Sequence, residues 1–239
     1  MMKKGLFALI VMIITLSISG ISAHAAPFNV YTETSGYAAG IDNFLPTGYM
    51  GDYLDITMTD GASGAHSGST CTYVDYTAAG SGGEGLTDGS GYHPLYWAGV
   101  YWQEPGNNWG DLDGGYDLTG STVLSFFAKG VNGGEKVTFG AGGIGAPPPY
   151  GKGDTFSVNM PTQTLTTDWQ QYTVDLSGLD MSHVIGGFKW AATRRDNPSG
   201  ATFLLDDITY DVIPEPSSLI LLGSGILGML SFSRKKKKA

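Results

Sequence analysis

Gln170-Gln-Tyr-Thr-Val-Asp-Leu176 alternates, from its second residue on, between polar and apolar side chains. Its apolar residues, Tyr172, Val174 and Leu176, share one parity, and the polar residues between them share the other. Successive side chains of a β-strand point to opposite faces, so this period of two predicts a strand with one buried face and one solvated face. The stretch therefore indicates a sheet in which one face packs on a core and the other face is in contact with solvent.

Strand-like stretches also lie on both sides of this one. Six more strands are predicted, over Thr70–Thr77, Leu95–Gln103, Thr122–Ala128, Lys136–Gly140, Val184–Ala191 and Thr202–Tyr210. Glycine-rich segments such as 80–91 and 142–153 separate them, and the chain holds 37 glycines. No helical period longer than a turn or two occurs before residue 213. The pattern predicts an all-β fold, a β-sandwich or jelly roll.

The first residues have the pattern of an export signal. Lys3 and Lys4 precede an apolar run that ends near Ile21, and Ala23-His24-Ala25 is a small-x-small sequence. This arrangement predicts a signal-peptide helix over residues 1–25, cleaved by signal peptidase after Ala25.

The last residues have three parts in a fixed order. Pro214-Glu215-Pro216 precedes 17 uncharged residues, Ser217 to Ser233. As a helix this run would rise about 26 Å, enough for most of a bilayer core. A basic cluster that should stay on the cytoplasmic side follows it, made of Arg234, Lys235, Lys236, Lys237 and Lys238.

The tail resembles the PEP-CTERM sorting signal in its Pro-Glu-Pro opening, its glycine-punctuated apolar run and its basic end. That resemblance implies processing by an exosortase, with an inner-membrane intermediate and then delivery to the cell surface or extracellular matrix. The chain then divides into a signal peptide (1–25), an ectodomain (26–212) and the sorting tail (213–239).

The ectodomain is strongly acidic. The whole chain has 22 Asp and Glu against 13 Lys and Arg, and seven of those cations lie in the two terminal segments. Such a charge argues against nucleic acid or an anionic membrane surface as a partner, and it favours a neutral polysaccharide over an acidic one. Cys71 is the only cysteine, so no intramolecular disulfide is possible, and we interpret it as a small apolar strand residue.

Aromatic residues are concentrated in Gly91–Gly110, which holds three of the five tryptophans. Parity places Trp102 in the core and Trp97 on the opposite face. Exposed rings can stack on the apolar face of a sugar, and amides can bind its hydroxyls. The candidate carbohydrate-binding residues are Trp97, Tyr101, Gln103, Asn107, Asn108, Trp109 and the loop residue Arg194. The alternative is that these rings fill a core, which is the role predicted for Trp169 and Trp190.

Asp206 is the candidate metal ligand. It shares parity with Leu204 and Ile208, and an inward carboxylate needs a partner or a metal. Cations are scarce in the ectodomain, so the sequence favours a structural Ca²⁺ held by oxygen ligands. A bulge in this strand would reverse the parity and remove the argument.

A second resemblance covers the later strands. Leu165-Thr-Thr-Asp-Trp-Gln-Gln-Tyr-Thr-Val-Asp-Leu176, then Phe188-Lys-Trp190 and Phe203-Leu-Leu-Asp-Asp-Ile208, are similar to the C-terminal half of jelly-roll carbohydrate-binding modules with the galactose-binding-like fold. The resemblance implies sugar binding and a final acidic strand that often ligates calcium, where Asp206 matches.

These patterns together predict an exported, surface-sorted, non-catalytic protein that binds carbohydrate, such as an exopolysaccharide. One alternative is a structural matrix or biofilm protein without a defined ligand. The other is a glycan-active enzyme, which is disfavoured because no Gly-x-Ser-x-Gly, His-Glu-x-x-His or P-loop pattern occurs.

Overall fold

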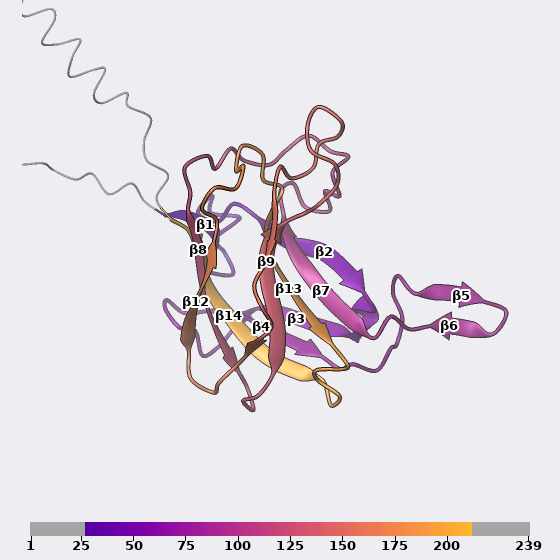
Figure 1. Ribbon diagram of the computed structural model, residues 1–239. Coiled ribbons are helices and arrows are strands. Elements are labelled where there is room, and N and C mark those ends of the chain that lie inside the picture. The colour runs from indigo at the N-terminus through magenta and orange to yellow at the C-terminus, as the bar shows by residue number, and fades with distance from the viewer. Residues whose placement is uncertain (1–26, 212–239) are drawn as a thin grey trace, which may run out of the picture.

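The alternating strand, β12 (Gln170–Asp175), lies at the edge of one of two antiparallel sheets in the computed structural model, which describes residues 27–211. The first sheet has the strand order β12-β8-β14-β4-β3, with β1 paired to β14. The second has the order β10-β9-β13-β7-β2, with β11 paired to β9. The two sheets pack face to face (Figure 1), which confirms the predicted all-β sandwich.

The elements, in chain order, are β1 (Phe28–Tyr31), β2 (Leu45–Gly51), the 3₁₀-helix η1 (Tyr53–Asp55), β3 (Ile56–Ala62), β4 (Cys71–Tyr76), β5 (Leu86–Asp88), β6 (Gly91–His93), β7 (Trp97–Gln103), β8 (Val123–Gly130), β9 (Lys136–Gly142), β10 (Ser157–Asn159), β11 (Gln163–Thr164), β12, β13 (Gly186–Thr193) and β14 (Ala201–Tyr210).

All seven predicted strands are present, with ends that shift by at most two residues. Strand β7 begins at Trp97 rather than Leu95 because Tyr96 has a φ of 57°, outside the extended region. The sequence analysis missed the remaining strands. Of these, β2 contains a proline and two glycines, and β3 carries only a short alternation, Ile56-Thr-Met-Thr.

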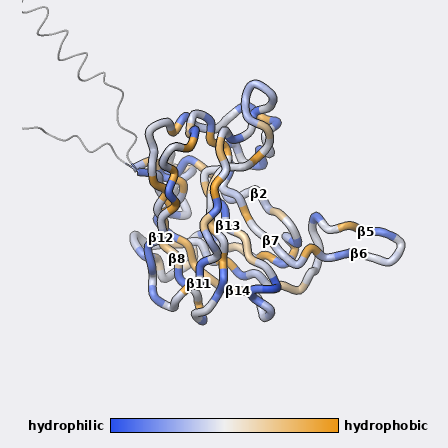
Figure 2. Tube along the Cα trace, in the orientation of Figure 1, coloured by the Kyte–Doolittle hydropathy of each residue, from blue (hydrophilic) through white to orange (hydrophobic). Residues whose placement is uncertain are grey.

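The core lies between the sheets and is rich in aromatic rings. Trp102 and Trp190 are both fully buried, as predicted. Trp102 meets Phe188 edge to face at 5.2 Å between ring centroids, and Trp190 meets Phe203 at the same distance. Hydrophobic residues line much of the two sheets (Figure 2), so the burial of apolar area holds the layers together.

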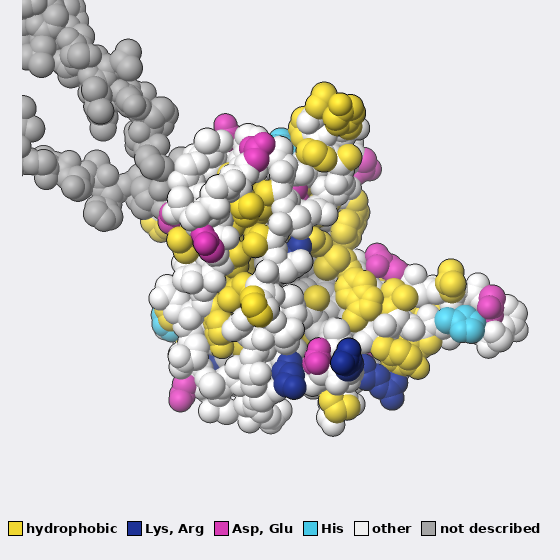
Figure 3. All heavy atoms as spheres, in the orientation of Figure 1, with side chains coloured by type: hydrophobic (Ala, Val, Ile, Leu, Met, Phe, Trp, Pro, Cys, Tyr) yellow, Lys and Arg dark blue, Asp and Glu magenta, His cyan; other side chains and the backbone are white. Residues whose placement is uncertain are grey.

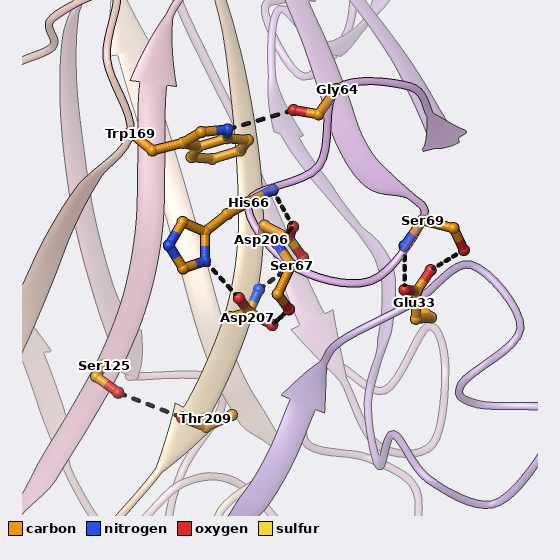
Figure 4. Close-up of polar contacts among 10 residues, drawn as sticks. All are labelled: Glu33, Gly64, His66, Ser67, Ser69, Ser125, Trp169, Asp206, Asp207 and Thr209. Atoms are coloured by element: carbon orange, nitrogen blue, oxygen red, sulfur yellow. Dashed lines mark hydrogen bonds and ion pairs between the residues drawn. The ribbon is translucent and has the colours of Figure 1, made fainter.

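Trp169 was predicted to be core, and this is wrong. It is half-buried on the outer side of the first sheet, where its indole N–H donates to the Gly64 carbonyl at 3.3 Å (Figure 4). The Lys129 ammonium lies over its ring, 5.0 Å from the centroid. Its position just before the edge strand β12 leaves it outside the two-sheet core.

Asp206 also faces outward, contrary to prediction. It pairs with Phe127 of β8, and a bulge between Asp206 and Thr209 then reverses the parity. Phe203 and Leu205 enter the core before the bulge, and Ile208 and Tyr210 enter it after the bulge. Asp207 takes the left-handed backbone conformation that makes the bulge, with a φ of 48°. The Asp206 carboxylate is nevertheless fully buried, because the segment 63–70 covers it.

The short hairpin β5–β6 projects from the sandwich as an arm (Figure 1). The buried carboxylate of Asp52 holds its base, since it accepts hydrogen bonds from the Tyr92 hydroxyl and from the N–H groups of Leu95 and Tyr96.

Within residues 27–211 no helix is long and apolar enough to cross a membrane. The predicted signal-peptide helix, the predicted transmembrane helix, Pro214-Glu215-Pro216 and the basic cluster Arg234–Lys238 lie outside the described residues.

Two adjacent phenylalanines on β8 test the layering. Phe126 is fully buried against Phe139, Tyr172 and Phe188, whereas Phe127 faces outward and stacks on His66. We expect Phe126→Ala to lower the free energy of unfolding by about 3–5 kcal/mol, since it leaves a core cavity. Phe127→Ala should cost roughly 1 kcal/mol, the worth of one stacked pair. Urea unfolding measures both, and equal losses would contradict the two-sheet core.

Candidate functional site

The strand register of the second sheet sets its outward side chains in rows. Because Phe139, Trp190 and Trp102 face the core, their neighbours along β9, β13 and β7 face out. Lys189 lies beside Gly140 and Tyr101, Ala191 beside Thr138 and Gly99, and Thr193 beside Trp97. Met50 of β2 lies beside Gly99. We call these residues, with Trp109 above Tyr101, the aromatic face, namely Met50, Trp97, Gly99, Tyr101, Trp109, Thr138, Gly140, Lys189, Ala191 and Thr193.

The middle of the aromatic face carries small side chains. Gly99, Ala191 and Thr138 form one row, and the Met50 methyl group extends over Gly99. Trp97 and Tyr101 lie on either side of this row, four residues apart on β7, which corresponds to about 13 Å along a strand. The row between Trp97 and Tyr101 is therefore made of small side chains, with the Met50 methyl group over Gly99.

Tyr101 was predicted to be an exposed contact residue, and its exposure is only 7%. It does point away from the core, but Trp109, Ile144 and Lys189 cover it. Its hydroxyl donates to the Gly142 carbonyl at 3.0 Å, and its ring meets the Trp109 ring edge to face at 6.2 Å. Burial raises the pKa of the Tyr101 hydroxyl well above its usual range, so the group stays neutral. Tyr101 thus supports Trp109 from below.

Gln103 and Asn108 were predicted to face a ligand, but both are fully buried. Gln103 donates from Nε2 to the Asn108 carbonyl at 2.8 Å and accepts from the Thr47 hydroxyl. The Asn108 side chain accepts from the N–H groups of Gly110 and Leu112 and donates to the Leu112 carbonyl. Buried polar groups need hydrogen-bond partners within the fold. These two amides find theirs in the loop that carries Trp109, and they therefore stabilise its conformation.

The remaining predicted contact residues are accessible. Trp109 is 43% exposed, Trp97 is half-buried, and Asn107 and Arg194 are exposed. Arg194 lies over the Tyr96 ring at 4.8 Å, just past the end of β13. The structure therefore brings Trp97 and Trp109 to one face and puts Arg194 at the end of that face.

A second loop, 143–153, packs against the Trp109 loop. Lys152 donates from its N–H to the Gly110 carbonyl at 3.2 Å, and its ammonium pairs with Asp113 at 2.9 Å. A Cβ on Gly110 would lie 2.8 Å from Gly145 Cα, so the two loops approach closely only because both residues are glycine. The loop also presents Tyr150, which is 90% exposed.

The buried carboxylate of Asp154 ties this second loop to β13. It accepts hydrogen bonds from the N–H groups of Ile144 at 2.9 Å, Ile185 at 2.6 Å and Gly186 at 3.0 Å. Burial raises the pKa of Asp154, although the three N–H bonds oppose that rise. The sequence analysis missed Asp154, Met50 and Lys189. Lys189 alone carried a signal, because it stands between two core residues, Phe188 and Trp190, and so must face out.

The surroundings of the Asp206 carboxylate consist of backbone hydrogen-bond donors. Its carboxylate accepts from the backbone N–H groups of His66 at 2.7 Å, Ser67 at 3.3 Å and Asp207 at 2.8 Å (Figure 4). These groups are hydrogen-bond donors, whereas calcium binds oxygen ligands. In the described part of the chain no three His, Cys, Asp or Glu side chains are grouped to hold a metal. Burial and the nearby Asp207 charge raise the pKa of Asp206 to about 6. The calcium assignment stays a prediction.

A cavity of about 290 Å³ lies elsewhere, between the turns 132–135 and 196–200. Its lining is polar and includes Glu135, Asp196 and Asn197, without an aromatic ring. It therefore lacks a stacking surface for a sugar, and the aromatic face is the stronger candidate for a binding site.

Comparison with known protein families identifies the tail. Residues 212–235 match the PEP-CTERM protein-sorting motif, which confirms the interpretation of the tail. No curated protein matches the chain significantly.

Solved structures similar to this chain include a family 30 carbohydrate-binding module of a cellulosomal cellulase of Clostridium thermocellum, at 16% identity and a TM-score of 0.49, covering 80% of this chain and 99% of that one. A family 11 module from a cellulosomal cellulase of the same organism is 15% identical with a TM-score of 0.47, covering 80% and 96%. A family 29 carbohydrate-binding module is 14% identical with a TM-score of 0.40, covering 78% and 92%.

Asp154→Asn tests the support of the site. An amide in place of the carboxylate turns one N–H group toward three buried donors, so we expect a loss of about 2 kcal/mol in the free energy of unfolding. Thermal melts measure this loss. Asp111→Asn is the matched control, since Asp111 is exposed and forms no side-chain hydrogen bond or ion pair among the described residues, so the melting temperature should stay unchanged. Equal melting of the Asp154 variant and the wild type would contradict this role.

Proposed function

We propose that this protein binds carbohydrate at the cell surface through its aromatic face. The observation that carries the proposal is the placement of Trp97 and Trp109 on one outward face, both partly exposed, with a low row of small residues beside them. An indole ring offers a flat apolar surface to the C–H face of a sugar. A row of small side chains lets a chain of sugars lie close to the sheet.

Polar groups at the same face can fix the orientation of the sugar hydroxyls. The hydroxyls of Thr138 and Thr193 lie on neighbouring strands, and Asn107 is exposed beside Trp109. Recognition then resembles other small-molecule sites, in which apolar contacts supply affinity and a few polar groups supply specificity. Each stacked ring should contribute on the order of 1 kcal/mol, so binding by two rings is of modest strength and gains from a repetitive ligand.

The sorting tail sets where this face acts. A PEP-CTERM signal implies export and processing by an exosortase, which would present the sandwich outside the cell, where an exopolysaccharide would be its ligand. Signal peptidase would remove residues 1–25 first, and the apolar run of the tail would hold an inner-membrane intermediate.

Binding without catalysis agrees with the surroundings of Asp154, a carboxylate close to the aromatic face. A glycosidase needs two carboxyl groups flanking the scissile bond. Asp154 is buried and accepts three backbone N–H groups, so it does not face a ligand. The other alternative, a matrix protein without a ligand, predicts no affinity for any sugar and is separated from our proposal by the experiment below.

Trp109→Ala tests the proposal directly. The loop that carries Trp109 is held by Asn108 and Gln103, so the variant should keep its melting temperature. We expect binding to soluble polysaccharides to weaken roughly tenfold, because about 1.4 kcal/mol is one decade of affinity. Trp97→Ala should weaken binding in the same direction. Affinity electrophoresis across a panel of polysaccharides is the measurement.

Trp169→Ala is the matched control, since this half-buried tryptophan lies on the outer side of the opposite sheet. It should bind as the wild type does. Retardation by none of the polysaccharides, or a Trp109→Ala variant with full affinity, would refute the aromatic face as the binding site.

A further inference from the structure

The charge of the aromatic face is opposite to that of the chain as a whole. Between residues 27 and 211 there are six lysines and arginines, and four of them, Lys136, Lys189, Arg194 and Arg195, lie on β9, on β13 or directly after β13. Figure 3 shows basic side chains gathered toward one end of this face, with an acidic side chain among them, and one more basic side chain near its middle. Other acidic side chains are scattered over the rest of the view. Four of the six cations between residues 27 and 211 thus lie on or next to the strands of the candidate site, where Asp196 also accepts a hydrogen bond from the Thr193 hydroxyl.

Lys189 is the cation at the centre of the face. It is half-buried, and its ammonium donates to the Gly142 carbonyl at 2.8 Å and to the Tyr101 hydroxyl at 3.1 Å. An ammonium has three donors, so one of them remains. Within residues 27–211 no carboxylate forms an ion pair with it. The nearby carboxylate of Asp154 is buried and accepts three backbone N–H groups, so an anion brought by a ligand would offset more of the cost of desolvating the ammonium.

The Lys189 side chain is held in place by its packing against Gly140 and Tyr101. A Cβ on Gly140 would lie 2.9 Å from Lys189 Cε, so the glycine leaves the space that the side chain occupies. The ammonium also lies over the Tyr101 ring, 5.1 Å from its centroid. Burial lowers the pKa of Lys189 to about 8, and the nearby Asp154 carboxylate opposes this shift. A lysine that served only solubility would extend into water.

We propose that the aromatic face selects polysaccharides that bear carboxylate groups, and that Lys189 is the residue that pairs with the carboxylate. The inference rests on the proposed function and names its ligand class, in place of the neutral polysaccharide that the overall charge favoured. A carboxylate in contact with the ammonium is paired at a few ångströms, whereas the acidic groups on the rest of the surface are screened beyond about 8 Å at physiological salt. Lys136 and Arg194, at the Trp97 end, extend the same preference along a repeating polyanion.

Two soluble polymers with the same β-1,4-glucan backbone test this proposal on the full chain in nonionic detergent. One is carboxymethylcellulose and the other is hydroxyethylcellulose, and the readout is the ratio of their dissociation constants. We expect the wild type to prefer the carboxylated polymer, and the preference to fall as salt rises. Lys189→Gln should reduce it about fivefold, as expected for one ion pair of roughly 1 kcal/mol, while Lys189→Arg restores it.

Lys129→Gln is the charge-matched control, because Lys129 lies over Trp169 on the outer side of the other sheet and should leave the ratio unchanged. A pH series on the wild type needs no variant. Since the free ammonium loses its proton near pH 8, the preference should decline between pH 7 and pH 10. Tyr101 stays neutral over that range and Asp154 is buried, so neither imitates the effect.

Equal affinity for the two polymers, or an unchanged ratio in Lys189→Gln, would overturn the carboxylate inference while sugar binding by the aromatic face stood. Binding to neither of these polymers, nor to polygalacturonate and its neutral counterpart galactan, would overturn both.

Discussion

The candidate site depends on one buried carboxylate. Asp154 gathers three backbone N–H groups, one from the loop 143–153 and two from the start of β13. A buried carboxylate is stable only when hydrogen bonds replace its water, so this group and its donors must stay together. The bond fixes Ile144 of the loop against Tyr101, and Tyr101 in turn lies under Trp109. An exposed aromatic contact thus rests on an interaction that no ligand reaches.

The division between support and contact follows from this arrangement. Three polar side chains form hydrogen bonds inside the fold that hold its loops, namely Gln103, Asn108 and Tyr101. The Trp109 ring, which packs on Tyr101, is exposed to solvent. Preorganisation of this kind lowers the conformational entropy lost on binding, which matters for a site that has few contacts to offer. Glycines also contribute to this preorganisation, because the absence of a side chain allows close packing. Gly99 lets a neighbouring strand approach, Gly110 and Gly145 let their two loops approach each other, and Gly140 leaves space for the Lys189 side chain.

The charged groups near the aromatic face differ in whether they are paired. Several carboxylates are satisfied by nearby N–H donors, as the buried Asp206 is under the segment 63–70 and Asp154 is beside the aromatic face. Lys189 is held by a carbonyl and a hydroxyl without an ion pair among the described residues. Net charge describes solubility and long-range encounter, whereas the ligand class depends on which charges are left unpaired at the site.

The amino-acid sequence by itself determined the fold class, the strands with strong alternation and the sorting tail, because these depend on local periodicity and on contiguous segments. Trp102 and Trp190 were placed correctly in the core for the same reason. The exposure of Tyr101 and Gln103 was decided by loops that come from elsewhere in the chain, and parity along one strand carries no information about them. The bulge at Asp206 likewise changed the side to which a carboxylate points. Only the tertiary structure could bring Trp97, Trp109 and Lys189 to one face, because strand register and loop packing, rather than sequence spacing, set which residues meet.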